Sequence, residues 1–110
     1  MSNPILVVSP NPNFGSLIQK SIEMAGDWTV VRAQSGTEAA LLGKSQPFSL
    51  AILDSDVRDI PLLTLISDLR NVSAEIKIVL IIPGKDLRRF DEAQADAFLT
   101  MPFQSVDLLD

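Results

Sequence analysis

Residues 50–59, LAILDSDVRD, place a short apolar run directly before three aspartates, Asp54, Asp56 and Asp59. Four apolar residues in a row have the length of a buried β-strand and are too short for a helix. If this run is an internal strand of a parallel sheet, Asp54 lies at its carboxyl end, where ligands and chemistry gather in such sheets. Asp54 is then either a reactive carboxylate or the polar end of a buried strand.

Four further apolar runs of strand length alternate along the chain with segments of helical spacing. The five strands are predicted at residues 5–8, 28–33, 50–53, 76–82 and 97–99. Because these runs are apolar along most of their length, they are typical of a parallel sheet that is covered on both faces. We therefore predict a doubly wound α/β domain with helices on both faces of a five-stranded sheet. Its most buried residues should include Val7, Ile52, Val79 and Ile81.

The segments between the strands carry apolar residues at steps of three and four, which indicates amphipathic helices. Helices are predicted over residues 14–25, 36–42, 61–69 and about 86–93, and from residue 105 onward. Asn13 is the predicted N-cap of the first helix, and Ser35 and Gly43 are predicted to begin and end the second. Pro61 suits the first position of the third helix, and Asp59 should favour the positive end of that helix.

The composition excludes several classes of function. The 110 residues suffice for one hydrophobic core, so we expect a single domain, either complete or the amino-terminal part of a longer protein. No apolar run approaches the ~20 residues that span a bilayer, and the chain begins without a basic leader, so we expect a cytoplasmic location away from membranes. The absence of cysteine and histidine excludes disulfides, thiolate metal sites and the usual general base of hydrolases. A formal net charge of −5 argues against binding to nucleic acid.

This arrangement resembles the receiver domain of bacterial two-component response regulators over nearly the whole chain. The segment ILVVSPNPNF is similar to the first strand and loop of that family, and LAILDSD is similar to its phosphoacceptor strand. The segment ADAFLTMPF is similar to the part that ends in the family's Lys-Pro-Phe signature. The resemblance implies a flavodoxin-like fold with the strand order 2-1-3-4-5. It also places Asp54 at the phosphoacceptor position and Phe98 at the position of an aromatic switch.

The resemblance further implies that receiver chemistry needs several groups around the phosphoacceptor. An acidic pair holds Mg²⁺, and a hydroxyl and a lysine stabilise the phosphoryl oxygens. In this sequence Ser9 and Pro10 stand at the acidic pair, Ile82 at the hydroxyl and Met101 at the lysine. Four of the five chemical positions have therefore changed. Without a cation, a phosphate dianion beside an ionised carboxylate is repelled.

We therefore expect a degenerate receiver, or pseudo-receiver, that is not an enzyme and uses neither cofactor nor metal. It would bind another protein, another domain of its own chain or a second copy, and Asp54 would be a retained structural carboxylate. The alternative is a phosphotransfer receiver that is phosphorylated on Asp54, with Asp56 and Asn11 as replacement cation ligands. A third candidate function is the binding of an apolar small molecule in the cleft between SPNPN and IIPGKD.

Two more expectations follow from the resemblance. Pro102 matches a proline that follows the family's lysine with a cis peptide bond. The predicted fourth helix spans fewer residues than the family's helix at this place, and a shorter helix should uncover apolar area. The candidate interaction surface is therefore Phe98, Phe103 and Leu108.

Overall fold

Five parallel strands form a single sheet in the order β2-β1-β3-β4-β5. The computed structural model describes residues 4–83 and 95–101 of the chain. The strands are β1 (Ile5–Val8), β2 (Val30–Ala33), β3 (Leu50–Asp54), β4 (Lys77–Pro83) and β5 (Ala97–Met101). The predicted fold class and strand order are therefore confirmed. In this order β1 and β3 are central, so their carboxyl ends meet in the middle of one edge of the sheet.

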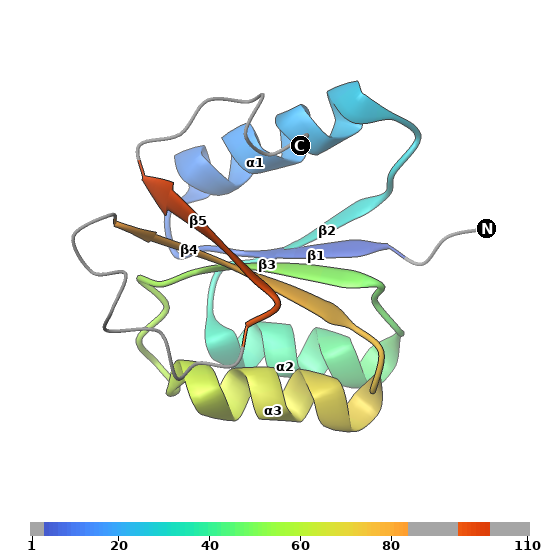
Figure 1. Cartoon of the computed structure of the whole chain (residues 1–110), viewed down its shortest axis with the longest axis vertical. Helices are drawn as coiled ribbons and strands as arrows, with labels where there is room; N and C mark the ends of the chain where they lie inside the picture. The colour runs from blue at the N-terminus through green and yellow to red at the C-terminus, as the bar shows by residue number, and fades with distance from the viewer. Residues whose placement is uncertain (1–3, 84–94, 102–110) are drawn as a thin grey trace.

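Three helices cover the sheet within the described residues. They are α1 (Pro12–Ala25), α2 (Gly36–Ser45) and α3 (Leu62–Val72). Figure 1 shows α1 on one face of the sheet and α2 and α3 together on the other, as predicted for a doubly wound fold. Among the described residues, no helix has the length and apolar character needed to cross a membrane. The helices predicted at 86–93 and from 105 onward lie outside the described residues, as do Pro102, Phe103 and Leu108.

The start of α1 differs from the prediction. The side chain of Asn11 is the N-cap and accepts hydrogen bonds from the amides of Asn13 and Phe14, at 2.9 and 3.2 Å. The prediction that Asn13 is the N-cap was wrong, because the helix already begins at Pro12. Proline suits this position, since the first amide of a helix has no intrahelical partner to lose.

The end of α2 also differs. The helix continues to Ser45, so the prediction that Gly43 ends it was wrong. Gly43 is buried against α3, where a Cβ atom would lie 2.9 Å from Cδ2 of Leu69. This glycine therefore lets α2 and α3 approach each other and does not terminate the helix.

The core lies on both sides of the sheet. The larger cluster joins the sheet to α2 and α3, and the smaller one joins it to α1. Val7, Ile52 and Ile81 are buried as predicted, but Val79 is only half-buried. Val79 packs against the smaller cluster, and α1 contacts the sheet chiefly at β1 and β2. The prediction that Val79 is among the most buried residues was wrong, because Val79 lies in β4, whereas α1 contacts chiefly β1 and β2.

Candidate functional site

Asp54 is the last residue of β3, and it is only 3% exposed. Its Oδ2 atom accepts a hydrogen bond from the Ser9 hydroxyl at 2.8 Å, and its Oδ1 atom accepts one from the Asp56 amide at 2.9 Å. Ser9 directly follows β1, which pairs with β3, so the two side chains meet where adjacent strands end. Both carboxylate oxygens of Asp54 are thus bonded within the protein.

Ser9 is itself held firmly in place. It is 3% exposed, and its amide donates to the Ala33 carbonyl at 3.0 Å, so it continues the pairing of β1 with β2. Its hydroxyl oxygen also accepts a hydrogen bond from the Asn11 amide at 3.2 Å. Ser9 therefore connects the loop before α1 to the end of β3. From the sequence, Ser9 was identified only as a replacement for an acid, and its hydrogen bond to Asp54 was not predicted.

The other positions that differ from the receiver pattern carry apolar side chains. Pro10 is exposed, and proline has no side-chain ligand. Ile82 is fully buried in the cluster beneath α2 and α3, and the half-buried Phe98 packs against the same cluster. Met101 pairs in register with Pro83 at the end of β5. Phe98 is thus a half-buried residue at the margin of the core, and Ile82 places no polar group near the carboxyl ends of the strands.

Of the two candidate replacement ligands of a cation, Asn11 is used in a helix cap and Asp56 forms a weak, exposed ion pair. Asn11 uses its side-chain oxygen to cap α1. The side chain of Asp56 is 59% exposed and lies 3.7 Å from the guanidinium of Arg58. Within residues 4–83 and 95–101, no group of three acidic side chains is placed to hold a metal ion. Mg²⁺ in proteins is usually bound through one or two carboxylates, with water completing its shell. Both oxygens of Asp54 already accept hydrogen bonds, so a cation here would have to compete with the Ser9 hydroxyl for Oδ2.

Asp59 lies at a different helix from the one predicted. Its carboxylate accepts hydrogen bonds from the amides of Gly36 and Thr37 and from the Thr37 hydroxyl, at 2.8, 2.9 and 2.7 Å. These bonds, led by that of the Thr37 hydroxyl, lower the pKa of Asp59 from 3.8 to about 2. The prediction that Asp59 serves the third helix was wrong, because its donors belong to the first turn of α2. Ser35 is the N-cap of α2 as predicted, and it accepts a hydrogen bond from the Glu38 amide.

No family model and no curated protein matches this sequence. Solved structures with the same fold are numerous. A CheY-like response regulator receiver domain from Methanospirillum hungatei has a TM-score of 0.84 and 20% identity, with 99% of this chain and 89% of that chain covered. A putative response regulator from Chloroflexus aurantiacus has a TM-score of 0.87 and 23% identity, with 99% and 93% covered.

A third similar structure is the receiver domain of a sensor histidine kinase from Pseudomonas aeruginosa with a magnesium ion coordinated in its active site cleft. Its TM-score is 0.84 at 18% identity, and the match covers 98% of this chain and 92% of that chain. The high TM-scores of these three structures establish the fold. Their sequence identities are too low to show what the site of this chain does. The chain therefore has the fold of the CheY-like receiver domains of response regulators.

Proposed function

We propose that this receiver-like domain acts by binding another protein, or another domain of its own chain, without phosphorylation and without catalysis. The observation that supports this proposal is the buried hydrogen bond between Ser9 and Asp54. In the resembling family an acidic residue next to the phosphoacceptor serves a cation, whereas here a neutral hydroxyl binds the carboxylate directly. The carboxylate is stabilised by this donor and by the Asp56 amide, so it has a structural role that needs no metal.

Electrostatics supports the same conclusion. A phosphoryl donor brings negative charge toward a carboxylate that is 3% exposed, where the repulsion is weakly screened. In the resembling family, two acids at these positions hold a cation that offsets this charge, and a hydroxyl and a lysine bind the phosphoryl oxygens. Here these four positions are Ser9, Pro10, Ile82 and Met101. Attack by Asp54 would also require Oδ2 to give up its hydrogen bond to Ser9. These costs add to one another, and no described side chain compensates for them.

A phosphotransfer receiver with an atypical cation site is the second candidate. In its favour, Asp54 stands at the end of a central strand, the position of the phosphoacceptor in the resembling family. One protein of similar fold, a response regulator from Burkholderia pseudomallei, has a phosphorylated aspartic acid and a calcium ion in its structure. Against it, Asn11 and Asp56 are engaged in a helix cap and an exposed ion pair.

The two functions can be separated by incubating the chain with Mg²⁺ and a small phosphodonor, or with beryllofluoride. Intact mass and amide NMR then report modification and cation binding. We expect no phosphoryl adduct and no saturable shifts at residues 9–11 and 54–56. The matched control is Asp54→Asn, which keeps the size of the side chain. An adduct in the wild type that is absent from this variant would overturn the proposal.

The surface that binds a partner is proposed to include Phe98, Phe103 and Leu108. Phe98 is the one member inside the described residues, and it is half-buried against the core. A partner bound at this surface should bind Asp54→Asn as tightly as the wild type and should bind Leu108→Asp more weakly. Loss of binding in the Asp54 variant alone would instead favour the phosphotransfer receiver, because binding would then depend on the carboxylate.

A further inference from the structure

Hydrogen bonds at the carboxyl ends of β2, β1 and β3 close into a ring. The Ser9 amide donates to the Ala33 carbonyl at 3.0 Å, and the Ser9 hydroxyl donates to Oδ2 of Asp54 at 2.8 Å. The chain then leads from Asp54 to Asp59, whose Oδ1 atom accepts a hydrogen bond from the Gly36 amide at 2.8 Å. Gly36 lies three residues after Ala33, so the path returns to the strand where it began. These five residues are the carboxyl-end ring.

The loop that joins Asp54 to Asp59 is itself tightly held. The Asp56 amide donates to Oδ1 of Asp54 at 2.9 Å, and the Val57 amide donates to the Asp54 carbonyl at 3.1 Å. Val57 is buried in the larger core cluster, and Ile60 packs against the same cluster. The loop also lies against the first residue of α2, where a Cβ atom would meet Cγ1 of Ile60 at 2.6 Å. Because packed segments transmit strain, this loop is too tightly held to absorb a displacement of Asp54 before it reaches Asp59.

The carboxyl-end ring connects the starts of two helices. Figure 1 shows that α1 and α2 lie on opposite faces of the sheet. On the side of α1, the Ser9 hydroxyl oxygen accepts a hydrogen bond from the amide of Asn11, the residue that caps this helix. On the side of α2, the Asp59 carboxylate accepts hydrogen bonds from the amides of Gly36 and Thr37. Both helix starts are therefore held by side chains that belong to the same ring.

We propose that the carboxyl-end ring is a conformational coupling that makes the start of α2 respond to the state of Asp54. In a closed ring, each hydrogen bond fixes groups that the other bonds need, so the bonds stabilise one another. Opening the ring between Ser9 and Asp54 releases the end of β3 from β1 and loosens the loop that carries Asp59. The amides at the start of α2 then open more often. Any ligand or modification that draws the Asp54 carboxylate away from Ser9 therefore changes α2.

The coupling is separate from the proposed function. The same hydrogen bonds close the ring whether Asp54 is a phosphoacceptor or a structural carboxylate. The proposed partner surface around Phe98 contains no member of the ring. The coupling can therefore exist even if the proposed function is wrong, and its test uses neither a partner nor a phosphodonor.

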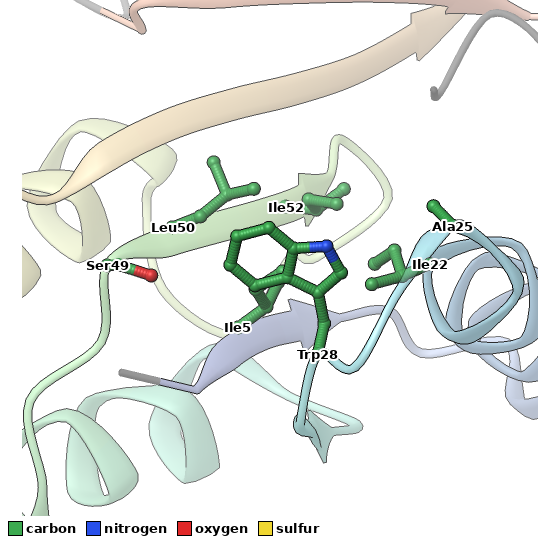
Figure 2. Close-up of a pocket in the computed structure, with 7 residues that line it drawn as sticks. All are labelled: Ile5, Ile22, Ala25, Trp28, Ser49, Leu50 and Ile52. Atoms are coloured by element: carbon green, nitrogen blue, oxygen red, sulfur yellow. The ribbon is translucent and has the colours of Figure 1, made fainter. Parts of the chain in front are cut away.

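The opposite end of the sheet provides a control position. An apolar cavity of about 260 Å³ lies there beside Trp28, as Figure 2 shows, and Ile5 and Leu50, the first residues of β1 and β3, line it. From the sequence, Trp28 was predicted inside a strand, but β2 begins only at Val30. No member of the carboxyl-end ring lines this cavity. Ile5→Val therefore weakens the packing of β1, the strand that leads to the ring, without touching the ring.

Amide hydrogen exchange of the full chain, read by NMR, tests whether α2 responds to Ser9. We expect the Gly36 and Thr37 amides to exchange several-fold faster in Ser9→Ala than in the wild type. Amides at a helix end exchange through local opening, so a general loss of stability should leave their rates unchanged. The control variant Ile5→Val should therefore not accelerate these two amides. Unchanged exchange in Ser9→Ala, or equal acceleration in both variants, would overturn the coupling.

A double-mutant cycle of Ser9→Ala with Asp59→Asn tests the closed ring itself. Each substitution weakens the ring at a different bond, so the second should cost less once the first has opened the ring. We expect the unfolding constant of the double variant to lie below the product of the two single effects by about threefold or more, which exceeds the usual error of additivity. The control cycle of Ile5→Val with Asp59→Asn should multiply, because these sites share no partner. Urea unfolding measures both cycles, and effects that multiply in the ring cycle as well would refute the coupling.

Discussion

The carboxylate of Asp59 accepts a hydrogen bond from the Thr37 hydroxyl at 2.7 Å, which joins the loop after β3 to the first turn of α2. The same carboxylate also accepts hydrogen bonds from the amides of Gly36 and Thr37. At the other end of this loop, Asp54 accepts a hydrogen bond from the Asp56 amide. The segment that leaves the candidate site is therefore fixed at both ends.

Asp59→Asn should lower stability at neutral pH and should flatten the dependence of stability on pH. The folded pKa of about 2 lies below the ordinary value of 3.8. Above about pH 4 the contribution of the carboxylate is therefore fully present, and it is lost as the pH falls through 2. Urea unfolding of both proteins from pH 7 to pH 2 measures the difference. Asp56→Asn is the control, since the carboxylate of Asp56 is exposed and its ion pair with Arg58 spans 3.7 Å. Parallel stability curves for wild type and Asp59→Asn would contradict this role.

Gly36→Ala should destabilise the domain. A Cβ atom at this position would lie 2.6 Å from Cγ1 of Ile60, so the loop or α2 would have to move. Overpacking of this kind costs about 1–3 kcal/mol, which exceeds the gain in helix propensity of about 1 kcal/mol. Gly26→Ala is the control, because its Cβ atom would approach Trp28 only to 3.4 Å. The loss should shrink in the double variant Gly36→Ala with Ile60→Ala, and an equal loss in both backgrounds would refute the steric explanation.

The sequence alone predicted the elements of this fold well and their ends less well. Apolar runs and helical spacing identified every described strand and helix, because burial on both faces of a parallel sheet imposes a strong pattern. The strand order came from the resemblance to receivers, since periodicity does not specify which strands pair. Asn13 and Gly43 were misassigned because a polar residue before a helix and a glycine near its end have more than one physical use. The structure uses Asn11 as the cap and Gly43 as a packing contact.

The sequence singled out residues of the candidate site but did not predict the contacts between them. Ser9 and Asp54 were both singled out, yet the hydrogen bond between residues 45 positions apart depends on the pairing of β1 with β3. Asp59 was assigned to the nearest helix in sequence, whereas it binds α2 across the fold. Contacts of this kind are tertiary, so local sequence signals do not determine them.

Ser9→Ala should destabilise the domain by about 1–3 kcal/mol, the usual cost of leaving a buried polar group without its partner. The lost donor binds Oδ2 of Asp54, which is 3% exposed and cannot turn readily to water. Urea unfolding at neutral pH measures the effect. Ser45→Ala is a suitable control because that hydroxyl is exposed and donates a hydrogen bond to the Leu42 carbonyl of its own helix. A similar loss of stability in the two variants would show that the buried hydrogen bond of Ser9 stabilises the fold no more than the exposed one of Ser45.

Arg70→Met should loosen the start of β5. The Oδ2 atom of Asp96 accepts hydrogen bonds from the Ile78 amide at 2.7 Å and from the Arg70 guanidinium at 3.0 Å. These contacts, with the Ile78 bond the largest, lower the pKa of Asp96. Amide hydrogen exchange should become faster in β5 than in the wild type, while exchange in β1 stays unchanged. Unchanged protection in β5 would show that the two hydrogen bonds between Asp96 and Ile78 hold this segment without Arg70.

The proposal that Ser9 and Pro10 leave this domain without a cation site can be tested by introducing two acids at these positions. We expect Ser9→Asp with Pro10→Asp to be less stable than the wild type without Mg²⁺, because a carboxylate would replace the hydroxyl that lies 2.8 Å from Oδ2 of Asp54. Mg²⁺ should then raise its unfolding temperature, since a cation that binds only the folded state adds about 2.7 kcal/mol at 100 times its dissociation constant. Ser9→Asn with Pro10→Asn, which adds no charge, should show no such response in the same thermal titration. If Mg²⁺ leaves both variants unchanged, the two acids are not sufficient, and the apolar surroundings contributed by residues such as Ile82 must also prevent a cation from binding.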